Sequence, residues 1–266
     1  MRKSNKTKIG LALGGGGARG ISHIGVLKVL DKAGIKIDYI VGTSMGAVIA
    51  SMYALGMNAR EIEAEALKSS SRLFIFKFID ISLRGEGMIG GKKIARHLKN
   101  IYKGSVFTQT GIPLRVVCTD LESGQEVVLK QGDIASAVQA SLSLPGVFPP
   151  VRIGKKLLVD GGVVNPTPIN VAREMGASTI IAVDLVMQKN RKLSKPTIAG
   201  TPMRTFEIVR SEAVKNRIKD KKTKLMIIKP KMNAVMDSFK FSQVKELIVS
   251  GELAAKSIIS DLKKLQ

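Results

Sequence analysis

The sequence predicts an α/β protein in three layers, with helices on both faces of a mainly parallel central sheet. Short apolar runs of strand length alternate along the chain with longer helical patterns, and this order favours parallel strands joined by helices. The 266 residues are 44% hydrophobic and 24% charged, so the chain can bury a full hydrophobic core and has the length of one large domain. We expect a single domain over residues 1–266, in which a motif-bearing part, 8–185, precedes a basic part, 186–266.

Each predicted strand is a short apolar run, and each predicted helix is a longer segment with apolar residues at helical spacing. The predicted strands are 9–13, 39–41, 114–118, 179–183 and 225–228. The predicted helices are 21–33, 45–55, 59–69, 92–102, 134–142, 168–175, 202–219 and 244–265. The uncharged run 39–59 is not expected to span a membrane, because Gly42, Ser44 and Gly46 interrupt it.

Four consecutive glycines, Gly14 to Gly17, lie between the first predicted strand and the first predicted helix. Glycines in a row leave backbone N–H groups open, as a site that stabilises a transient oxyanion requires. Gly15, Gly16 and Gly17 are therefore the candidate oxyanion hole. Arg19 follows them, and its role stays open: it orients a phosphate or the glycine loop, or it pairs with a structural carboxylate.

Ser44 lies in the pattern G-x-S-x-G, directly after the apolar run 37–41 and directly before a helical pattern. In this context Gly42 and Gly46 let the chain turn sharply from strand to helix and leave the serine Oγ exposed at the helix N-terminus. A serine at a helix start can also serve only as an N-cap. Capping does not require a glycine on each side, so we predict that Ser44 is a nucleophile.

Asp160 ends an apolar stretch and is followed by Gly161 and Gly162, which allow another loop to pack closely against the carboxylate. The carboxylate can then lie within hydrogen-bond reach of a hydroxyl and act as a general base. An aspartate before a glycine can also be only a turn residue. Asp120 and Asp184 end strand-like runs and are rival bases, but neither precedes paired glycines.

The two histidines distinguish two serine mechanisms. In Ser-His-Asp hydrolases of the α/β-hydrolase fold, the histidine follows both the serine and the acid. His23 precedes Ser44, and His97 lies in a basic helical pattern too early to follow an acid-bearing strand. A histidine-free dyad of Ser44 and Asp160 fits better. With two distant histidines and one cysteine, Cys118, no metal site is expected.

Three motifs of this chain together resemble those of the patatin-like phospholipases, specifically the bacterial and neuropathy-target-esterase type branch. They are G-G-G-x-[RK]-G at 15–20, G-x-S-x-G at 42–46 and D-G-[GA] at 160–162. The resemblance extends over about residues 8–185, including 140–150 and 165–168. It implies a patatin-like fold, a Ser-Asp dyad without a cofactor, and cleavage of acyl ester bonds in phospholipids or lysophospholipids.

Two other classes of function stay open. Residues 15–20 also satisfy G-x-G-x-x-G, and Asp38 lies 18 residues further on, as in a dinucleotide-binding oxidoreductase. Asp38 precedes its strand, however, whereas the ribose-binding acid should end it. A non-enzymatic regulatory or interaction module is the other class, because fold does not fix function. The intact Ser44 and Asp160 count against that module.

The net charge is +22, and half of it lies between Lys189 and Lys231, where 14 Lys or Arg residues stand against three acidic residues. Such a stretch attracts anionic lipid headgroups, at about 1 kcal/mol per Lys or Arg near the surface, or nucleic-acid phosphates. Aromatic residues are only 4% and no nucleic-acid motif is present, so we expect contact with an anionic membrane surface and no nucleic acid. A solvated face is the alternative.

The compartment and two segments complete the predictions. The apolar run after the basic N-terminus is short and lacks a cleavage-like site, so we expect a cytoplasmic protein, peripheral at the inner face of the membrane. Cys118 is predicted to be a small buried strand residue. Residues 73–79 form a core or edge strand or, with the glycines up to Gly91, a mobile lid. Residues 187–202 are expected to form a long loop.

Overall fold

A computed structural model describes residues 7–70, 87–186, 200–218, 223–231 and 243–264. Its sheet has eight strands in the order β5-β6-β3-β2-β1-β7-β8, with β4 paired to β3 outside this path. The strands are β1 (Ile9–Leu13), β2 (Tyr39–Thr43), β3 (Leu114–Asp120), β4 (Glu126–Leu129), β5 (Val151–Ile153), β6 (Lys156–Asp160), β7 (Thr179–Val183) and β8 (Lys224–Ile228).

The sheet is parallel from β3 through β2, β1 and β7 to β8. Strands β4, β5 and β6 join it in antiparallel pairs beside β3. The prediction of a mainly parallel sheet is confirmed. The sequence did not predict the antiparallel edge, because β4 and β5 are only four and three residues long and are partly exposed.

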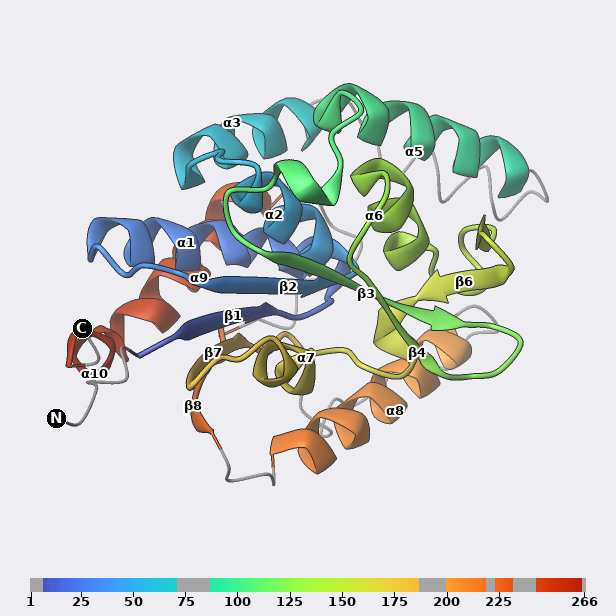
Figure 1. Ribbon diagram of the computed structural model, residues 1–266. Coiled ribbons are helices and arrows are strands. Elements are labelled where there is room, and N and C mark those ends of the chain that lie inside the picture. The colour runs from blue at the N-terminus through green and yellow to red at the C-terminus, as the bar shows by residue number, and fades with distance from the viewer. Residues whose placement is uncertain (1–6, 71–86, 187–199, 219–222, 232–242, 265–266) are drawn as a thin grey trace, which may run out of the picture.

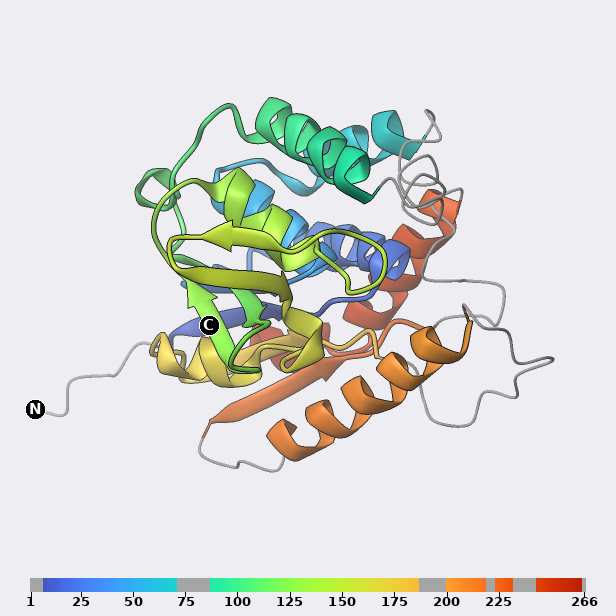
Figure 2. The ribbon, with the colours of Figure 1, turned by 90° about the vertical axis from the view of Figure 1, so that its right-hand side faces the viewer.

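Helices cover both faces of the sheet, which confirms the three-layer arrangement (Figure 1). On one face lie α1 (Ser22–Lys32), α2 (Met45–Ala54), α3 (Ala59–Ser70), α5 (Gly87–Tyr102), α6 (Ile134–Leu142) and α9 (Val244–Lys256). On the other lie α7 (Ile169–Glu174) and the long α8 (Gly200–Ile218), which runs beneath the sheet in Figure 2. A short helix, α10 (Ile259–Lys263), follows α9.

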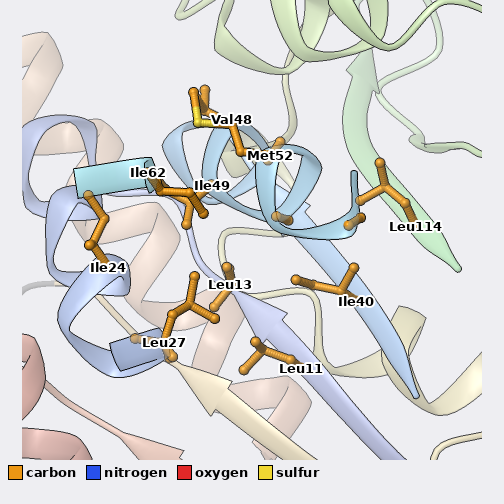
Figure 3. Packing of buried hydrophobic residues seen from close by; sticks show 14 of the residues in the cluster. Leu11, Leu13, Ile24, Leu27, Ile40, Val48, Ile49, Met52, Ile62 and Leu114 are labelled. Carbon is orange, nitrogen blue, oxygen red and sulfur yellow. The ribbon is translucent and has the colours of Figure 1, made fainter. Parts of the chain in front are cut away.

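The core lies mainly between the sheet and the first helical layer. Leu11 and Leu13 of β1 point toward Leu27 of α1 and Ile49 of α2, and all four are buried (Figure 3). A smaller apolar cluster around Ala12 lies on the other face, between the sheet and α7. Successive side chains of β1 therefore pack against opposite helical layers, and the buried strand leads directly into the glycine run.

The remaining predictions about the fold have different outcomes, and one of them is wrong. The single helix predicted over 244–265 is wrong: α9 ends at Lys256, where the Ser257 hydroxyl donates to the Ala254 carbonyl, and α10 then buries Leu262. The uncharged run 39–59 forms β2 and α2, and no described helix is long and apolar enough to cross a membrane. Residues 73–79 and 187–199 lie outside the described residues, whereas 200–202 begin α8. Cys118 is buried in β3, as predicted.

Candidate active site

The register of the strands brings three loops together at one edge of the sheet. Leu13 at the end of β1 is paired with Gly42 of β2, and Thr43 is paired with Val117 of β3. Strand β6 runs antiparallel to β3 and pairs Asp160 with Cys118. The glycine run after β1, the serine after β2 and the aspartate at the end of β6 therefore meet, although 116 residues separate the last two.

Ser44 has the backbone conformation of a sharp strand-to-helix turn. Its φ is 55° and its ψ is −126°, in a region that residues with a side chain rarely occupy and that costs about 1–3 kcal/mol. Its N–H donates to Ser141 Oγ at 2.8 Å, and the Ser141 hydroxyl donates to the Val117 carbonyl at 2.6 Å. Ser141 of α6 thus holds the strained turn against β3.

The two glycines that flank Ser44 are required by close packing. A Cβ on Gly42 would overlap the Gly46 carbonyl and the backbone of Ala47. A Cβ on Gly46 would overlap the carbonyls of Leu13 and Gly14 at the end of β1. The G-x-S-x-G pattern therefore lets α2 start directly against both β2 and the glycine run.

Asp160 is hydrogen-bonded to Ser44. The Ser44 hydroxyl donates to Asp160 Oδ2 at 2.6 Å, and the Gly162 N–H donates to Asp160 Oδ1 at 2.6 Å. The Asp160 backbone is fixed as well, because its N–H donates to the Ser143 carbonyl at 2.9 Å and its carbonyl accepts from the Thr119 hydroxyl at 3.0 Å. The carboxylate is thereby aimed at the serine from a rigid strand end.

The environment of Asp160 suits a base. The residue is 4% exposed, and this burial raises the pKa of its carboxyl above the ordinary aspartate value. The positive charge of Arg210 and the hydrogen bonds from Ser44 and Gly162 oppose the rise. A carboxylate with a raised pKa accepts a proton more readily, provided that the pH keeps it ionised.

The glycine run is held by its backbone. The Gly14 N–H donates to the Val183 carbonyl at 3.0 Å, and the Gly15 N–H donates to the Pro166 carbonyl at 2.8 Å. The N–H of Gly15 is therefore already engaged, which differs from its predicted role as an oxyanion donor. Gly17 has a φ of 58°, a value that glycine adopts without strain, and it begins a short 3-10 turn, Gly17–Ile21.

Arg19 contacts both the glycine run and a carboxylate, the two kinds of protein partner that the sequence left open. Its Nε donates to the Gly16 carbonyl at 3.2 Å, so it orients the glycine run. Its Nη2 lies 3.4 Å from Glu207 Oε1 of α8, and the Arg19 side chain is 1% exposed. The buried ion pair thus ties the glycine run to a helix of the basic C-terminal part.

Neither histidine is bonded to Ser44. His23 of α1 is fully buried, and burial lowers the pKa of its imidazole to about 4, so the ring is neutral at pH 7. Its Nε2–H donates to the Gly14 carbonyl at 2.7 Å, which holds the start of the glycine run against α1. His97 lies on α5, where burial lowers the pKa of its imidazole and the charge of Glu65 on α3 opposes this shift.

The rival acidic residues have other partners. Asp120 accepts from the hydroxyl of Ser123 at 2.9 Å, and Asp184 is paired with Lys229 at 3.2 Å. Asp38 accepts from the Ile9 N–H at 2.9 Å, at the start of β1. It therefore lies at the opposite end of β1 from the glycine run, which argues against the dinucleotide-binding alternative.

The structure adds residues that the motifs did not identify. Ser141 lies in the segment 140–150 that carried part of the family resemblance, so the sequence held a signal for it. Glu207 and Arg210 were counted only as members of the charged stretch 189–231. Arg210 is 7% exposed and its Nη2 donates to the Gly15 carbonyl, so α8 reaches the active site directly.

The comparisons with known proteins agree with this fold and this set of motifs. The model of the family described as "Patatin-like phospholipase" matches residues 11–173. An uncharacterized NTE family protein of Mycobacterium tuberculosis is 36% identical over 185 residues, covering 70% of this chain and 51% of that protein. The human patatin-like phospholipase domain-containing protein 6 is 36% identical over 190 residues, covering 70% of this chain and 14% of that protein.

Among solved structures, VipD from Legionella pneumophila has the same fold, with a TM-score of 0.54 and 15% identity over 96% of this chain and 67% of that one. The chain belongs to the patatin-like phospholipase family. It spans about half the length of the mycobacterial relatives that it matches, and the matched segment 11–173 stops before α8.

Proposed function

We propose that this protein is a serine hydrolase that cleaves acyl ester bonds of phospholipids or lysophospholipids. The observation that carries the proposal is the 2.6 Å hydrogen bond from Ser44 Oγ to Asp160 Oδ2, at a turn that holds the serine in a strained conformation. Family membership and the names of the relatives support the lipid substrate class.

In the proposed reaction Asp160 Oδ2 takes the proton of the Ser44 hydroxyl while Oγ forms a bond to the carbonyl carbon. The electron pair of the C=O bond moves to the oxygen, which the N–H groups of Gly16 and Gly17 stabilise. We narrow the oxyanion hole to these two glycines, since the N–H of Gly15 is donated to Pro166. The oxyanion then re-forms the C=O bond, the bond to the leaving alcohol breaks, and this alcohol takes the proton from Asp160. In the second step Asp160 takes a proton from the water that attacks the acyl carbon, and it returns this proton to Ser44 Oγ when the bond between Oγ and the acyl group breaks.

Apolar side chains lie near Asp160 around a small hollow that has room for about one water molecule. It is lined by Ile94 of α5, Leu142 of α6 and Phe148 with Pro149, and it reaches Ser143, whose carbonyl accepts the Asp160 N–H. We propose that the acyl chain of the ester extends along these side chains.

We also propose that residues 1–266 form one domain, because α8 contacts the glycine run through Arg19 and Gly15.

We also propose peripheral contact with an anionic membrane at its cytoplasmic face. On α8 the side chain of Lys215 is 54% exposed, and Ile208 and Val209 are 43% and 50% exposed. Cations with neighbouring apolar side chains suit an interface of anionic lipids. In this arrangement α8 presents one face to the lipid and the other to the active site.

Labelling by a fluorophosphonate probe tests the proposed function, since only an activated serine reacts quickly. We expect the wild-type protein to be labelled and the Ser44→Ala variant not to be labelled, because the reacting oxygen is removed. Ser257→Ala is the matched control: its hydroxyl bonds the Ala254 carbonyl in an exposed turn and should leave labelling unchanged. Equal labelling of the Ser44→Ala variant would mean that the reactive serine is not Ser44, and a wild-type protein that is not labelled would favour the non-enzymatic alternative.

A further inference from the structure

Arg210 of α8 is a buried cation that lies against both loops of the proposed active site. Its Nη2 donates to the Gly15 carbonyl, and its guanidinium lies 5.4 Å from the ring centre of Phe206, one turn earlier on the same helix. Its Nε is buried and has no hydrogen-bond partner among the described residues. Burying a guanidinium costs free energy unless a nearby negative charge and hydrogen bonds compensate for the lost water.

Two glycines leave the space that Arg210 occupies. A Cβ on Gly15 would lie 3.0 Å from Ser44 Cβ and 3.1 Å from Arg210 Nη2. A Cβ on Gly162 would lie 2.9 Å from Asp160 Oδ1 and 3.3 Å from Arg210 Nε. Gly15 therefore lies between the guanidinium and the serine, and Gly162 lies between the guanidinium and the carboxylate, so a side chain at either glycine would crowd Arg210.

The other carboxylates near Arg210 have cations of their own. Glu207 places one oxygen 3.4 Å from Arg19 and the other 3.3 Å from Arg204. Asp184 is paired with Lys229 at 3.2 Å. Asp160 instead has hydrogen bonds from Ser44 and Gly162, and the positive charge that lowers the pKa of its carboxyl is that of Arg210. Arginine stays protonated in proteins, so this charge is permanent.

We infer that Arg210 is a positioning residue that supplies a fixed counter-charge to the dyad and to the oxyanion. This inference rests on the proposed function. The reacting groups carry one negative charge before and after the proton transfer: it lies on Asp160 at first and on the substrate oxygen once Asp160 is protonated. A buried cation next to both loops stabilises the charge at either place, and the preorganised site needs no reorganisation as the charge moves.

The hydrogen bond to Gly15 gives Arg210 a second effect. It holds the carbonyl of Gly15, while the N–H of the same residue is held by Pro166, so the peptide that precedes Gly16 is fixed at its oxygen. This orientation decides where the N–H of Gly16 points. Arg210 therefore acts on the oxyanion donors through the backbone and on Asp160 through its charge, and the two effects are separable by substitution.

The test compares Arg210→Gln, which removes the charge, with Arg210→Lys, which keeps the charge and loses the planar fork, on a soluble short-chain ester. We expect the glutamine variant to lose about 10²-fold in kcat with little change in KM. Its acid limb of kcat/KM against pH should move up by about one pH unit or more, because Asp160 then holds its proton more tightly. The lysine variant should keep the wild-type acid limb and recover part of kcat.

Arg60→Gln on α3 is the matched control, because Arg60 is an exposed arginine on the far helical layer. It should leave kcat and the pH profile unchanged. If Arg210→Gln keeps the wild-type acid limb, or if the lysine and glutamine variants lose kcat equally, Arg210 only packs α8 onto the sheet and the inference is wrong.

The outcomes also separate this inference from the proposed function. Should Arg210→Gln fail to fold, the lysine variant decides alone: an acid limb at the wild-type pH with a lowered kcat supports the inference, and a shifted acid limb overturns it. Wild-type turnover that persists in Ser44→Ala rejects the proposed function and this inference with it. Ser44-dependent turnover that is indifferent to Arg210 rejects only the inference.

Discussion

The proposed active site combines two regions of the chain whose sequences look very different. The ends of β1, β2 and β6 carry small residues in recognisable patterns, among them Gly42, Ser44 and Gly162. Helix α8 carries no pattern beyond its basic character, yet two of its side chains, Glu207 and Arg210, contact the glycine run through Arg19 and Gly15. The strand ends provide space and backbone donors, and α8 provides charge.

This difference explains why the second glycine after Asp160 is there. Gly161 packs against the carbonyl of Val117 in β3, where a Cβ would overlap it. Gly162 instead faces the guanidinium of Arg210 and donates its N–H to Asp160. Gly161 thus allows close packing against β3, and Gly162 leaves space for Arg210 of α8. The second glycine of the motif is therefore explained by a helix that comes later in the chain.

The largest effect expected in the strand-end region after loss of Ser44 is that of Asp160→Asn. An amide cannot accept the serine proton, so kcat should fall by about 10⁴-fold or more, the range in which loss of a catalytic-triad residue lowers kcat in other serine hydrolases. Since burial raises the pKa of Asp160, wild-type kcat/KM should also fall as the pH drops through a value above that of an ordinary aspartate. Initial rates on a soluble ester across a pH series measure both.

Asp120→Asn is the control for this change, because Asp120 lies on the neighbouring strand and bonds Ser123 instead of Ser44. Its rates should match those of the wild type. A normal rate in Asp160→Asn together with an inactive His97→Ala would contradict the Ser44–Asp160 dyad and indicate a mechanism with a histidine base. The end of β6 would then have no part in the proposed active site.

A smaller effect is expected for Gly16→Ala, which changes one of the two proposed oxyanion donors. The added Cβ would lie 3.0 Å from two side-chain atoms of Leu185, so either Leu185 or the backbone at residue 16 must shift by a few tenths of an ångström. We expect part of this shift to fall on the Gly16 N–H. Loss of one donor lowers kcat by about 10²–10³-fold, and KM should change less. A normal kcat would mean that the oxyanion donors lie elsewhere. Gly111→Ala, where an added Cβ would meet its nearest neighbour, the Ala54 carbonyl, at an ordinary 3.8 Å, is the control for a glycine substitution that leaves this loop alone.

The sequence predicted most of the fold because the inner strands have continuous apolar runs and the helices between them are long. It failed at short or interrupted elements: β4 and β5 are too short to show a pattern, and the polar turn at Ser257 divides the last helix. For the site, the glycine motifs predicted where Ser44 and Asp160 lie, and their hydrogen bond agrees with that prediction.

The contribution of α8 was beyond sequence reasoning for a physical reason. Along α8 an inward-facing arginine and an outward-facing lysine look alike, and only the packed structure separates Arg210, 7% exposed, from Lys215, with a side chain 54% exposed. The net charge of the stretch therefore overstates the charge available to a partner. Arg204 and Arg210 turn inward, toward Glu207 and Gly15.

The last prediction concerns the basic residues between 215 and 222, and its effect is the smallest per residue. We expect activity on anionic vesicles to exceed activity on neutral ones and to fall with added salt, because exposed charges are screened over about 8 Å at physiological ionic strength. Neutralising the cluster Lys215, Arg217, Lys219, Lys221 and Lys222 should reduce vesicle activity, by about 1 kcal/mol of binding per residue, and leave hydrolysis of a soluble ester unchanged.

The control for that cluster removes the same charge from α5 and the residue that follows it, where five cations are exposed: Lys92, Lys93, Arg96, Lys99 and Lys103. If both sets reduce vesicle activity equally, the total charge of the protein attracts the lipid and α8 has no special part. If neither set matters, the cluster is a solvated face. A loss confined to the set between 215 and 222 would mean that the part of the chain that begins in the last turns of α8 docks on the membrane, so that membrane binding and the positioning of Arg210 both depend on the α8 region.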